Sequence, residues 1–189
     1  ARTTESQVHR ELASGLSCPV GFKNGTDGTI KIGIDAIGAA SASHHFLSVT
    51  KFGHSAIVET TGNPDCHIIL RGGKLPNFDA ESVAQVTSQL EAAKLNTKVM
   101  IDFSHANSQK KFQNQMLVSE DVAGQISAGN QNVFGVMVES HLVEGRQDLV
   151  DGEELTYGQS ITDACIGWRD TETLLAQLND AVATRKTIK

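Results

Sequence analysis

Cys66-His67-Ile68-Ile69-Leu70-Arg71-Gly72-Gly73 is the stretch that decides the fold: a nearly continuous apolar strand stops at a cation, and two glycines follow. An apolar strand of this kind is covered on both faces, as in a parallel sheet flanked by helices. Similar short apolar runs that end at a polar side chain occur at residues 19–23, 99–102 and 133–139. Residues 133–138 are the most apolar of them and are expected to form the most buried strand. The pattern predicts an α/β protein.

Helical periodicity fills the intervals between these strands. Ile30, Ile34 and Ile37 are spaced i, i+4, i+7, and comparable stripes predict helices at about 79–94 and 111–128. The chain therefore alternates strand and helix several times, which is the order found in parallel sheets with crossover helices.

Further helices are predicted at the beginning and the end of the chain, together with one insertion. Thr4 is expected to cap the first helix and Asp170 the last. Two strands at 45–49 and 55–60, joined by a short turn, predict an inserted β-hairpin. No repeat, linker or low-complexity tract divides the sequence, so residues 1–189 are predicted to belong to one domain without an internal boundary.

The composition argues against several classes of protein. Of the 189 residues, 39% are hydrophobic, which is enough for a core and excludes a disordered chain. Asp and Glu (22) outnumber Lys and Arg (16), and the net charge of −6 is unfavourable for binding nucleic acid. The longest apolar run, residues 133–138, is far shorter than the roughly 18 to 20 residues of a membrane-spanning helix. Cys18, Cys66 and Cys165 fit neither a disulfide framework nor a paired-cysteine zinc site, so a cytoplasmic protein is predicted.

Polar side chains follow the apolar strands at the point where each strand ends. Lys23, Arg71, Asp102 with His105, and Glu139 occupy these positions. In a β/α barrel or an open parallel sheet, the carboxyl ends of the strands meet at one face, where active sites are built. These distant residues are therefore expected to converge.

The cations among them suggest an anion site. Lys23 and Arg71, with Arg2 as a third candidate, would gather positive charge in an acidic protein. An Arg offers a planar fork for phosphate or carboxylate, and a Lys offers a compact charge. The set predicts a small, multiply charged anion, and the alternative is that each cation is a solvated loop residue.

A second set, His105, Glu139 and Asp163, has the chemistry of a metal site. One imidazole and two carboxylates suit Mn, Fe, Co or Zn. No local spacing motif supports this set. The other histidines are interpreted as structural: His9, His44, His45, His54, His67 and His141.

Six runs, in the same order along the chain, resemble a known family. They are residues 1–7, 19–26, 70–74, 101–107, 138–141 and 161–165. Together they resemble the 3-deoxy-D-arabino-heptulosonate-7-phosphate (DAHP) synthases of the microbial, feedback-inhibited type. The resemblance extends over essentially the whole chain.

The resemblance implies a fold. Members of the family form a (β/α)8 TIM barrel with an inserted hairpin, in subunits nearly twice as long as this chain. Ala1 would fall just after the fourth barrel strand, so residues 1–189 would be the C-terminal half of the barrel domain, with about four barrel strands plus the β-hairpin. The start on Ala1 instead of Met agrees with this expectation.

The resemblance also implies an activity. The family are transferases that condense phosphoenolpyruvate with erythrose 4-phosphate, releasing phosphate, in the first step of the shikimate pathway of aromatic amino acid biosynthesis. Arg2, Lys23, Arg71 and the backbone of Ala1 would bind phosphoenolpyruvate. Three of the four ligands of one divalent metal ion (Mn, Fe, Co or Zn) would be His105, Glu139 and Asp163, and the fourth, a Cys, would lie outside this chain. The catalytic candidates are Lys23, His105 and Asp163. Asp102 is not among the residues that match the family, and its place at a strand end makes it a candidate for contacting the metal ligands without binding the metal.

Feedback inhibition implies a further pocket, near the hairpin. Its matching residues are Leu12, Leu16, Ser17, Phe46, Ser48 and Val58. Ser48 resembles the phenylalanine-sensitive members, whereas a glycine is typical of tyrosine-sensitive ones. The family further implies a homo-oligomer, a dimer or a tetramer.

Two alternatives to this interpretation remain at the level of the sequence. One is a related phosphoenolpyruvate-condensing synthase that uses a five-carbon sugar phosphate, such as the 8-phosphate octulosonate synthase. The other is a non-catalytic fragment, because a half barrel has open sheet edges and an incomplete core. The isolated chain is expected to be inactive without the N-terminal half.

Overall fold

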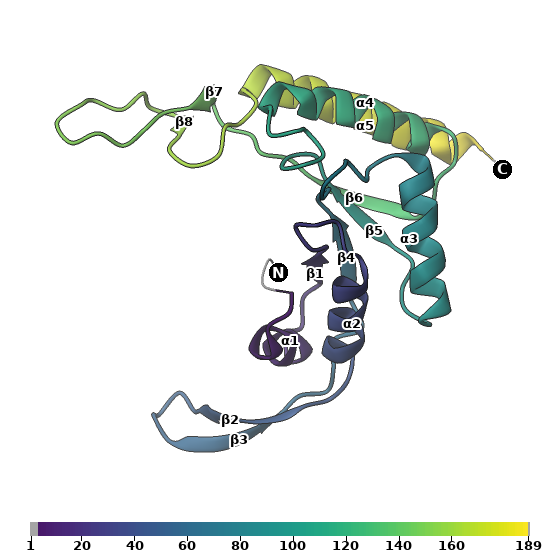
Figure 1. Cartoon of the computed structure of the whole chain (residues 1–189), viewed down its shortest axis with the longest axis vertical. Coiled ribbons are helices and arrows are strands. Elements are labelled where there is room, and N and C mark those ends of the chain that lie inside the picture. Colours follow the sequence, from purple (N-terminus) through teal and green to yellow (C-terminus); the bar gives the residue numbers. More distant parts are fainter. Residues whose placement is uncertain (1–3, 189) are drawn as a thin grey trace.

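The computed structural model describes residues 4–188, and its centre is a parallel sheet of four strands (Figure 1). The strands, in spatial order, are β1 (Val20–Lys23), β4 (Cys66–Leu70), β5 (Val99–Asp102) and β6 (Val133–Met137). Each neighbouring pair is parallel. The predicted α/β class is confirmed.

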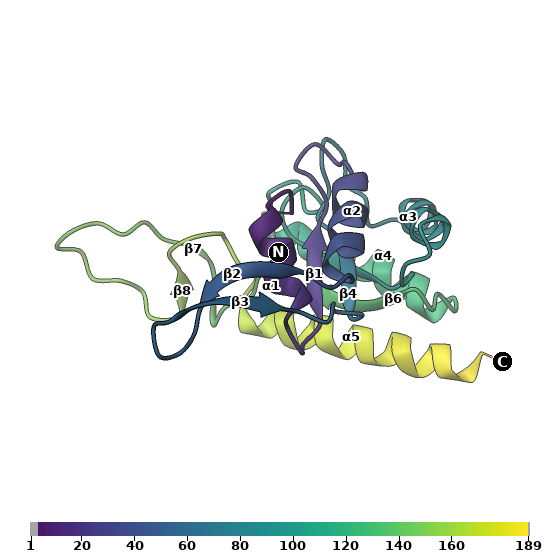
Figure 2. The same ribbon diagram turned by 90° about the horizontal axis from the view of Figure 1, so that it is seen from below.

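Helices connect consecutive strands of this sheet. They are α2 (Lys31–Ala40), α3 (Ala80–Ala92) and α4 (Gln115–Ser127), the last preceded by the 3-10 turn η1 (Phe112–Asn114). Before β1, α1 (Gln7–Ser14) packs against α2, and the final helix α5 (Trp168–Thr187) lies alongside α4 (Figures 1 and 2). Among residues 4–188, no helix has both the length and the apolar character needed to cross a membrane.

One face of the sheet packs on these helices and forms the core. Phe22, Ile68 and Leu70 are fully buried on this face, and so is Ile101 on β5. All five residues of β4 are buried, because β4 has a neighbouring strand on each side.

Strand β6 corrects one sequence prediction. It was expected to be the most buried strand, but Phe134 at its second position is 48% exposed. Within the described part of the chain, β6 is an edge strand that pairs only with β5 along its length. Apolar content indicates a strand, whereas its burial depends on its place in the sheet.

The opposite face of the sheet is more polar and requires one close approach. Gly21 and Lys23 on β1 pair in register with His67 and Ile69 on β4. A Cβ atom at Gly21 would lie 2.3 Å from Cδ1 of Ile69 and 2.7 Å from Nε2 of His67. Only glycine therefore leaves room for these two side chains. The ring of His67 meets the ring of Phe134 edge-on, with 4.8 Å between the centroids.

Two projections extend from the body of the molecule (Figure 1). The first is the antiparallel hairpin of β2 (His45–Val49) and β3 (Ser55–Glu59), which confirms the predicted insertion. The second contains the short pair β7 (Val143–Arg146) and β8 (Gln159–Ser160), which was not predicted. Its residues are too few and too polar to give a strand pattern.

Both predicted helix caps are wrong. Ser6 is the N-cap of α1, and the buried hydroxyl of Thr4 instead donates a hydrogen bond to the carbonyl of Lys23 at 2.8 Å. Gly167 is the N-cap of α5, and Asp170 lies in the first turn. An acidic residue in that turn still interacts favourably with the helix dipole.

Candidate active site

The carboxyl ends of the four parallel strands meet at one edge of the sheet, as predicted. Two adjoining cavities lie there, of about 490 Å³ and 540 Å³. Thr26 and Arg71 line both of them. The larger cavity also contains His105, Glu139 and Asp163 in its wall, and the smaller contains Lys23. The structure thus brings the two predicted sets of side chains together.

The smaller cavity has more cations than carboxylates in its wall: Lys23 and Arg71 against Glu5. The side chain of Lys23 is only 11% exposed, and its Nζ lies 2.6 Å from Oδ2 of Asp102. Nε of Arg71 is buried and has no hydrogen-bond partner among residues 4–188. An unsatisfied buried donor is costly, so this guanidinium is available to an anion. Ala1 and Arg2, which were also predicted to bind the anion, lie outside the described residues.

Asp102 lies close to Lys23 of the smaller cavity and to His105 of the larger one. It is fully buried, and its Oδ1 accepts the backbone N–H of Ser104 at 3.0 Å. Its Oδ2 lies 3.3 Å from Nδ1 of His105 as well as close to Lys23. Burial by itself raises the pKa of Asp102, but the His105 ring and the Lys23 ammonium outweigh it, and the pKa lies below its ordinary value. Asp102 is therefore a carboxylate at neutral pH, and its Oδ2 lies close to the same ring nitrogen of His105 that faces Glu139.

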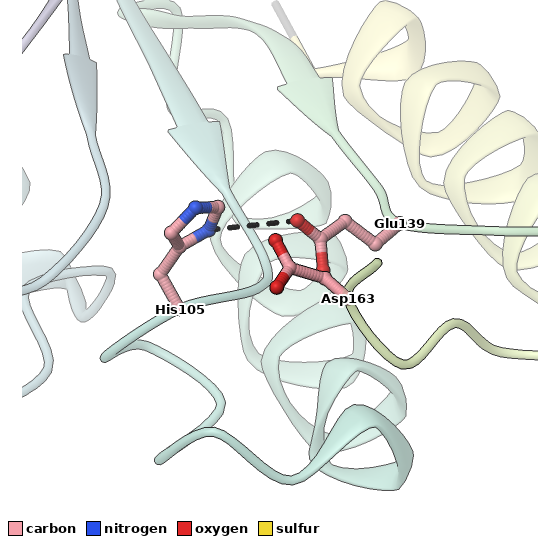
Figure 3. Close-up of side chains that lie close together, drawn as sticks. All are labelled: His105, Glu139 and Asp163. Atoms are coloured by element: carbon pink, nitrogen blue, oxygen red, sulfur yellow. Dashed lines mark ion pairs between the residues drawn. The ribbon is translucent and has the colours of Figure 1, made fainter. Parts of the chain in front are cut away.

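His105, Glu139 and Asp163 form a compact cluster in the larger cavity. One candidate ligand atom from each lies within 4.8 Å of the others. Figure 3 shows both carboxylates turned toward the imidazole, with Nδ1 of His105 3.9 Å from Oε1 of Glu139. They come from three places: after β5, after β6, and from the loop between β8 and α5.

The donor set of this cluster fits a divalent metal ion. Nδ1 of His105 is buried and has no hydrogen-bond partner with acceptable geometry among the described residues. One imidazole with two carboxylates is suited to Mn, Fe, Co or Zn. Three protein ligands also leave a coordination position for another group.

The backbone at His105 is held in an uncommon conformation. Its φ is 59°, in the left-handed region that non-glycine residues rarely occupy. The carbonyl of His105 accepts the N–H of Lys110 at 2.8 Å, and the hydroxyl of Ser108 at 3.2 Å. These bonds fix the turn that directs the imidazole into the cavity, and such strain is typical of functional positions.

Glu139 is held by two residues that the sequence reasoning missed. The hydroxyl of Ser104 donates to Oε2 of Glu139 at 2.7 Å. The fully buried amide of Gln115 donates to the carbonyl of Glu139 at 3.0 Å and accepts its N–H at 2.9 Å. Gln115 thereby pairs with the backbone of Glu139 as a neighbouring strand would. The one signal in the sequence is a glutamine near the start of an otherwise apolar helix face, which is too weak to assign a role.

The six residues expected to bind an inhibitor lie at the hairpin and α1. Phe46 and Val58 are partners across the hairpin, and Ser48 lies on the same half-buried face. Leu12 and Leu16 are about half exposed on and just after α1. None of the six lines either cavity of the candidate active site. The inhibitor site formed by these six residues stays a prediction.

The cysteines are free, and two of the three are buried. Burial raises the pKa of the Cys66 thiol to about 11, and it also raises the pKa of Cys165. These two are protonated and unreactive at neutral pH. Cys18, in contrast, is exposed.

Comparisons with known proteins found a matching family model and several similar relatives. The model of a family described as the DAHP synthetase I family matches residues 1–176. The Phe-sensitive phospho-2-dehydro-3-deoxyheptonate aldolase of Escherichia coli (strain K12) is 69% identical over 186 residues, which are 98% of this chain and 53% of that protein. The phospho-2-dehydro-3-deoxyheptonate aldolase of Haemophilus influenzae is 68% identical over 187 residues, 98% of this chain and 52% of that protein.

A solved structure gives the same result for the fold. The structure of phospho-2-dehydro-3-deoxyheptonate aldolase from Francisella tularensis SCHU S4 matches with a TM-score of 0.93 at 51% sequence identity. The match covers 98% of this chain and 54% of that one. The chain spans about half the length of the relatives it matches.

Proposed function

Because the chain belongs to the DAHP synthetase I family, we propose that the complete protein containing it is a DAHP synthase. It would condense phosphoenolpyruvate with erythrose 4-phosphate to give DAHP and phosphate, the first step of aromatic amino acid biosynthesis. The observation that carries the proposal is the pair of adjoining cavities: Arg71 borders both, Lys23 lies in one, and the His105 cluster lies in the other.

Phosphoenolpyruvate is the proposed occupant of the smaller cavity. It carries a phosphate and a carboxylate, and Lys23 and Arg71 offer a point charge and a planar fork to such groups. Lys23 donates one of its three N–H bonds to Asp102, which leaves two for the ligand. Arg2 and the backbone of Ala1 complete the site in this proposal. The function of these residues is to neutralise the ligand and fix which face of its enol carbon is open.

The metal ion is the proposed occupant of the larger cavity. His105, Glu139 and Asp163 would hold it, together with a Cys from outside this chain. When bound, a divalent ion supplies a Lewis acid that polarises the aldehyde of the sugar phosphate. His105 and Asp163 place this chemistry beside bound phosphoenolpyruvate, and with Lys23 they are the proposed catalytic residues.

We further propose that residues 1–189 are the C-terminal half of a (β/α)8 TIM barrel domain. The four parallel strands, the helices between them and the TM-score of 0.93 support this assignment. The N-terminal half would complete the barrel and be required for activity. The complete protein would be a homo-oligomer. Phenylalanine is the proposed feedback inhibitor, supported by the name of the Escherichia coli relative and by Ser48.

The test is phosphate release by the complete protein from phosphoenolpyruvate and erythrose 4-phosphate, before and after removal of metal. Release that requires both substrates and is lost with chelator, then restored by Mn²⁺, supports the proposal. Release that survives thorough metal removal contradicts the metal site. Preference for a five-carbon sugar phosphate would instead identify the related synthase. Full activity of the 189-residue chain alone would contradict the assignment as a half barrel.

A further inference from the structure

The backbone that carries Arg71 is held by asparagine side chains from three different loops. Four polar groups of residues 70–72 are bonded in this way: the carbonyl of Leu70, the N–H of Arg71, and the N–H and carbonyl of Gly72. The buried Nε of Arg71 itself has no hydrogen-bond partner among residues 4–188. The position of the guanidinium therefore depends on the backbone beneath it.

Asn24, directly after β1, makes two of these bonds. It is 3% exposed, and its Oδ1 accepts the N–H of Arg71 at 2.8 Å. Its Nδ2 donates to the carbonyl of Gly72 at 3.0 Å. One amide thus bonds the N–H group before the Arg71–Gly72 peptide unit and the carbonyl group after it.

Asn77 and Asn107 make the other two bonds. Oδ1 of Asn77 accepts the N–H of Gly72 at 2.7 Å. Nδ2 of Asn107, which is also 3% exposed, donates to the carbonyls of Leu70 at 3.2 Å and Asp102 at 2.8 Å. Oδ1 of Asn107 accepts the N–H of Asn77 at 2.9 Å. The three amides therefore join the loops after β1, β4 and β5 into one network.

Close packing restricts the same turn. Gly72 has a φ of +73°, and a Cβ there would lie 2.8 Å from both Cβ of Ala106 and the backbone N of Asn107. The chain turns sharply after Arg71 and rests directly on the loop that follows β5. A side chain that leaves such a fixed turn begins from a defined position, which limits the space its guanidinium can reach.

We propose that Asn24 and Asn107 are positioning residues that aim Arg71 at the phosphoenolpyruvate anion, an inference that rests on the proposed function. Neither amide needs to contact the ligand. Each acts through the backbone of residues 70–72, and loss of either lets the guanidinium move away from a position in which two of its N–H groups would meet the anion.

The experiment measures the dissociation constant of phosphoenolpyruvate by calorimetry, using the complete protein without metal. Asn24→Ser and Asn107→Ser introduce no charge, and each is expected to weaken binding at least tenfold. The matched control is Asn63→Ser. Asn63 is 2% exposed and its amide likewise bonds two carbonyls and one N–H, but it does so before β4, at the other end of the strand. The control is expected to lose stability and to change binding less than twofold.

A second measurement separates positioning from a general loss of structure. In protein that already carries Arg71→Ala, Asn24→Ser should change the remaining affinity less than twofold, since the residue it positions is gone. An undiminished loss in that background, or a loss in Asn63→Ser equal to that in Asn24→Ser, overturns the inference. If either variant fails to fold, Asn77→Ser tests the same turn from a half-buried position, with an expected loss of at least threefold.

The two proposals fail in different ways. If the unaltered protein binds no phosphoenolpyruvate, the proposed function is wrong and this inference falls with it. If the unaltered protein binds phosphoenolpyruvate and Asn24→Ser and Asn107→Ser bind it equally well, only the inference is wrong.

Discussion

Replacing Gln115 by Met tests whether the backbone of Glu139 must be held for metal to bind. Methionine has a similar length and keeps the helix, but it removes both hydrogen bonds to Glu139. The N–H of Glu139 then loses its only partner among residues 4–188, at a cost of about 1–3 kcal/mol. The carbonyl keeps the N–H of Ile166 at 3.0 Å, so its loss is about 1 kcal/mol. The variant should therefore be destabilised by about 2–4 kcal/mol.

The same change should weaken metal binding. Groups that orient a metal ligand typically contribute about 10- to 100-fold in affinity, and this is the expected rise in the dissociation constant for Mn²⁺. The measurement is a calorimetric titration of the metal-free complete protein, with denaturant unfolding in parallel. Activity is not needed for either readout.

Ser119→Ala is the matched control. Ser119 lies one turn further along α4, is fully buried, and donates a hydrogen bond to Gln177 at 2.9 Å, away from the cluster. It should cost about 1 kcal/mol of stability and leave metal affinity unchanged within twofold. If Gln115→Met binds Mn²⁺ as tightly as Ser119→Ala does, the reasoning about Glu139 is refuted.

Two further predictions concern stability and need only unfolding measurements. Asp79 is the N-cap of α3, and although burial raises its pKa, the hydrogen bonds from the first turn outweigh this and lower it. The stabilisation by Asp79 is therefore complete above its unfolded-state pKa of about 3.9 and is lost as the pH falls through its folded-state pKa. Asp79→Asn should flatten the acid limb of the stability curve, and Asp79→Ala should cost about 1 kcal/mol at pH 7. An acid limb identical in the unaltered protein and both variants would contradict this. Gly21→Ala should lower stability by about 1–3 kcal/mol, because the new Cβ would overlap Ile69. Gly38→Ala, within α2, places its new Cβ more than 4 Å from every atom outside the neighbouring residues and the local helix backbone, so it should raise stability by up to about 1 kcal/mol. A loss of equal size in both variants would refute the packing argument.

Local patterns predicted the elements that depend on local sequence. The strand at residues 66–70 and the hairpin at residues 45–59 were found from apolar runs and turn residues, and both are present. The convergence of Lys23, Arg71 and the His105 cluster also followed, because parallel strands end at a common edge.

Features that depend on tertiary contacts were missed. The exposure of Phe134 depends on which strand lies at the edge of the sheet, and no residue near it carries that information. Thr4 looked like a cap, yet its hydroxyl bonds the end of β1, 19 residues away. Gln115 and the asparagines around Arg71 bond backbone groups up to 48 residues distant, so their roles become visible only when the loops are placed.

The outer side of β1 has a practical consequence for anyone who expresses residues 1–189 by themselves. Within residues 4–188, β1 pairs with β4 alone and is an edge strand of the sheet, and an edge strand is a place where another chain can add. Overproduced in bacteria, such a polypeptide should collect in inclusion bodies. Co-expression with the proposed N-terminal half is the preparation we expect to yield material suitable for crystallisation.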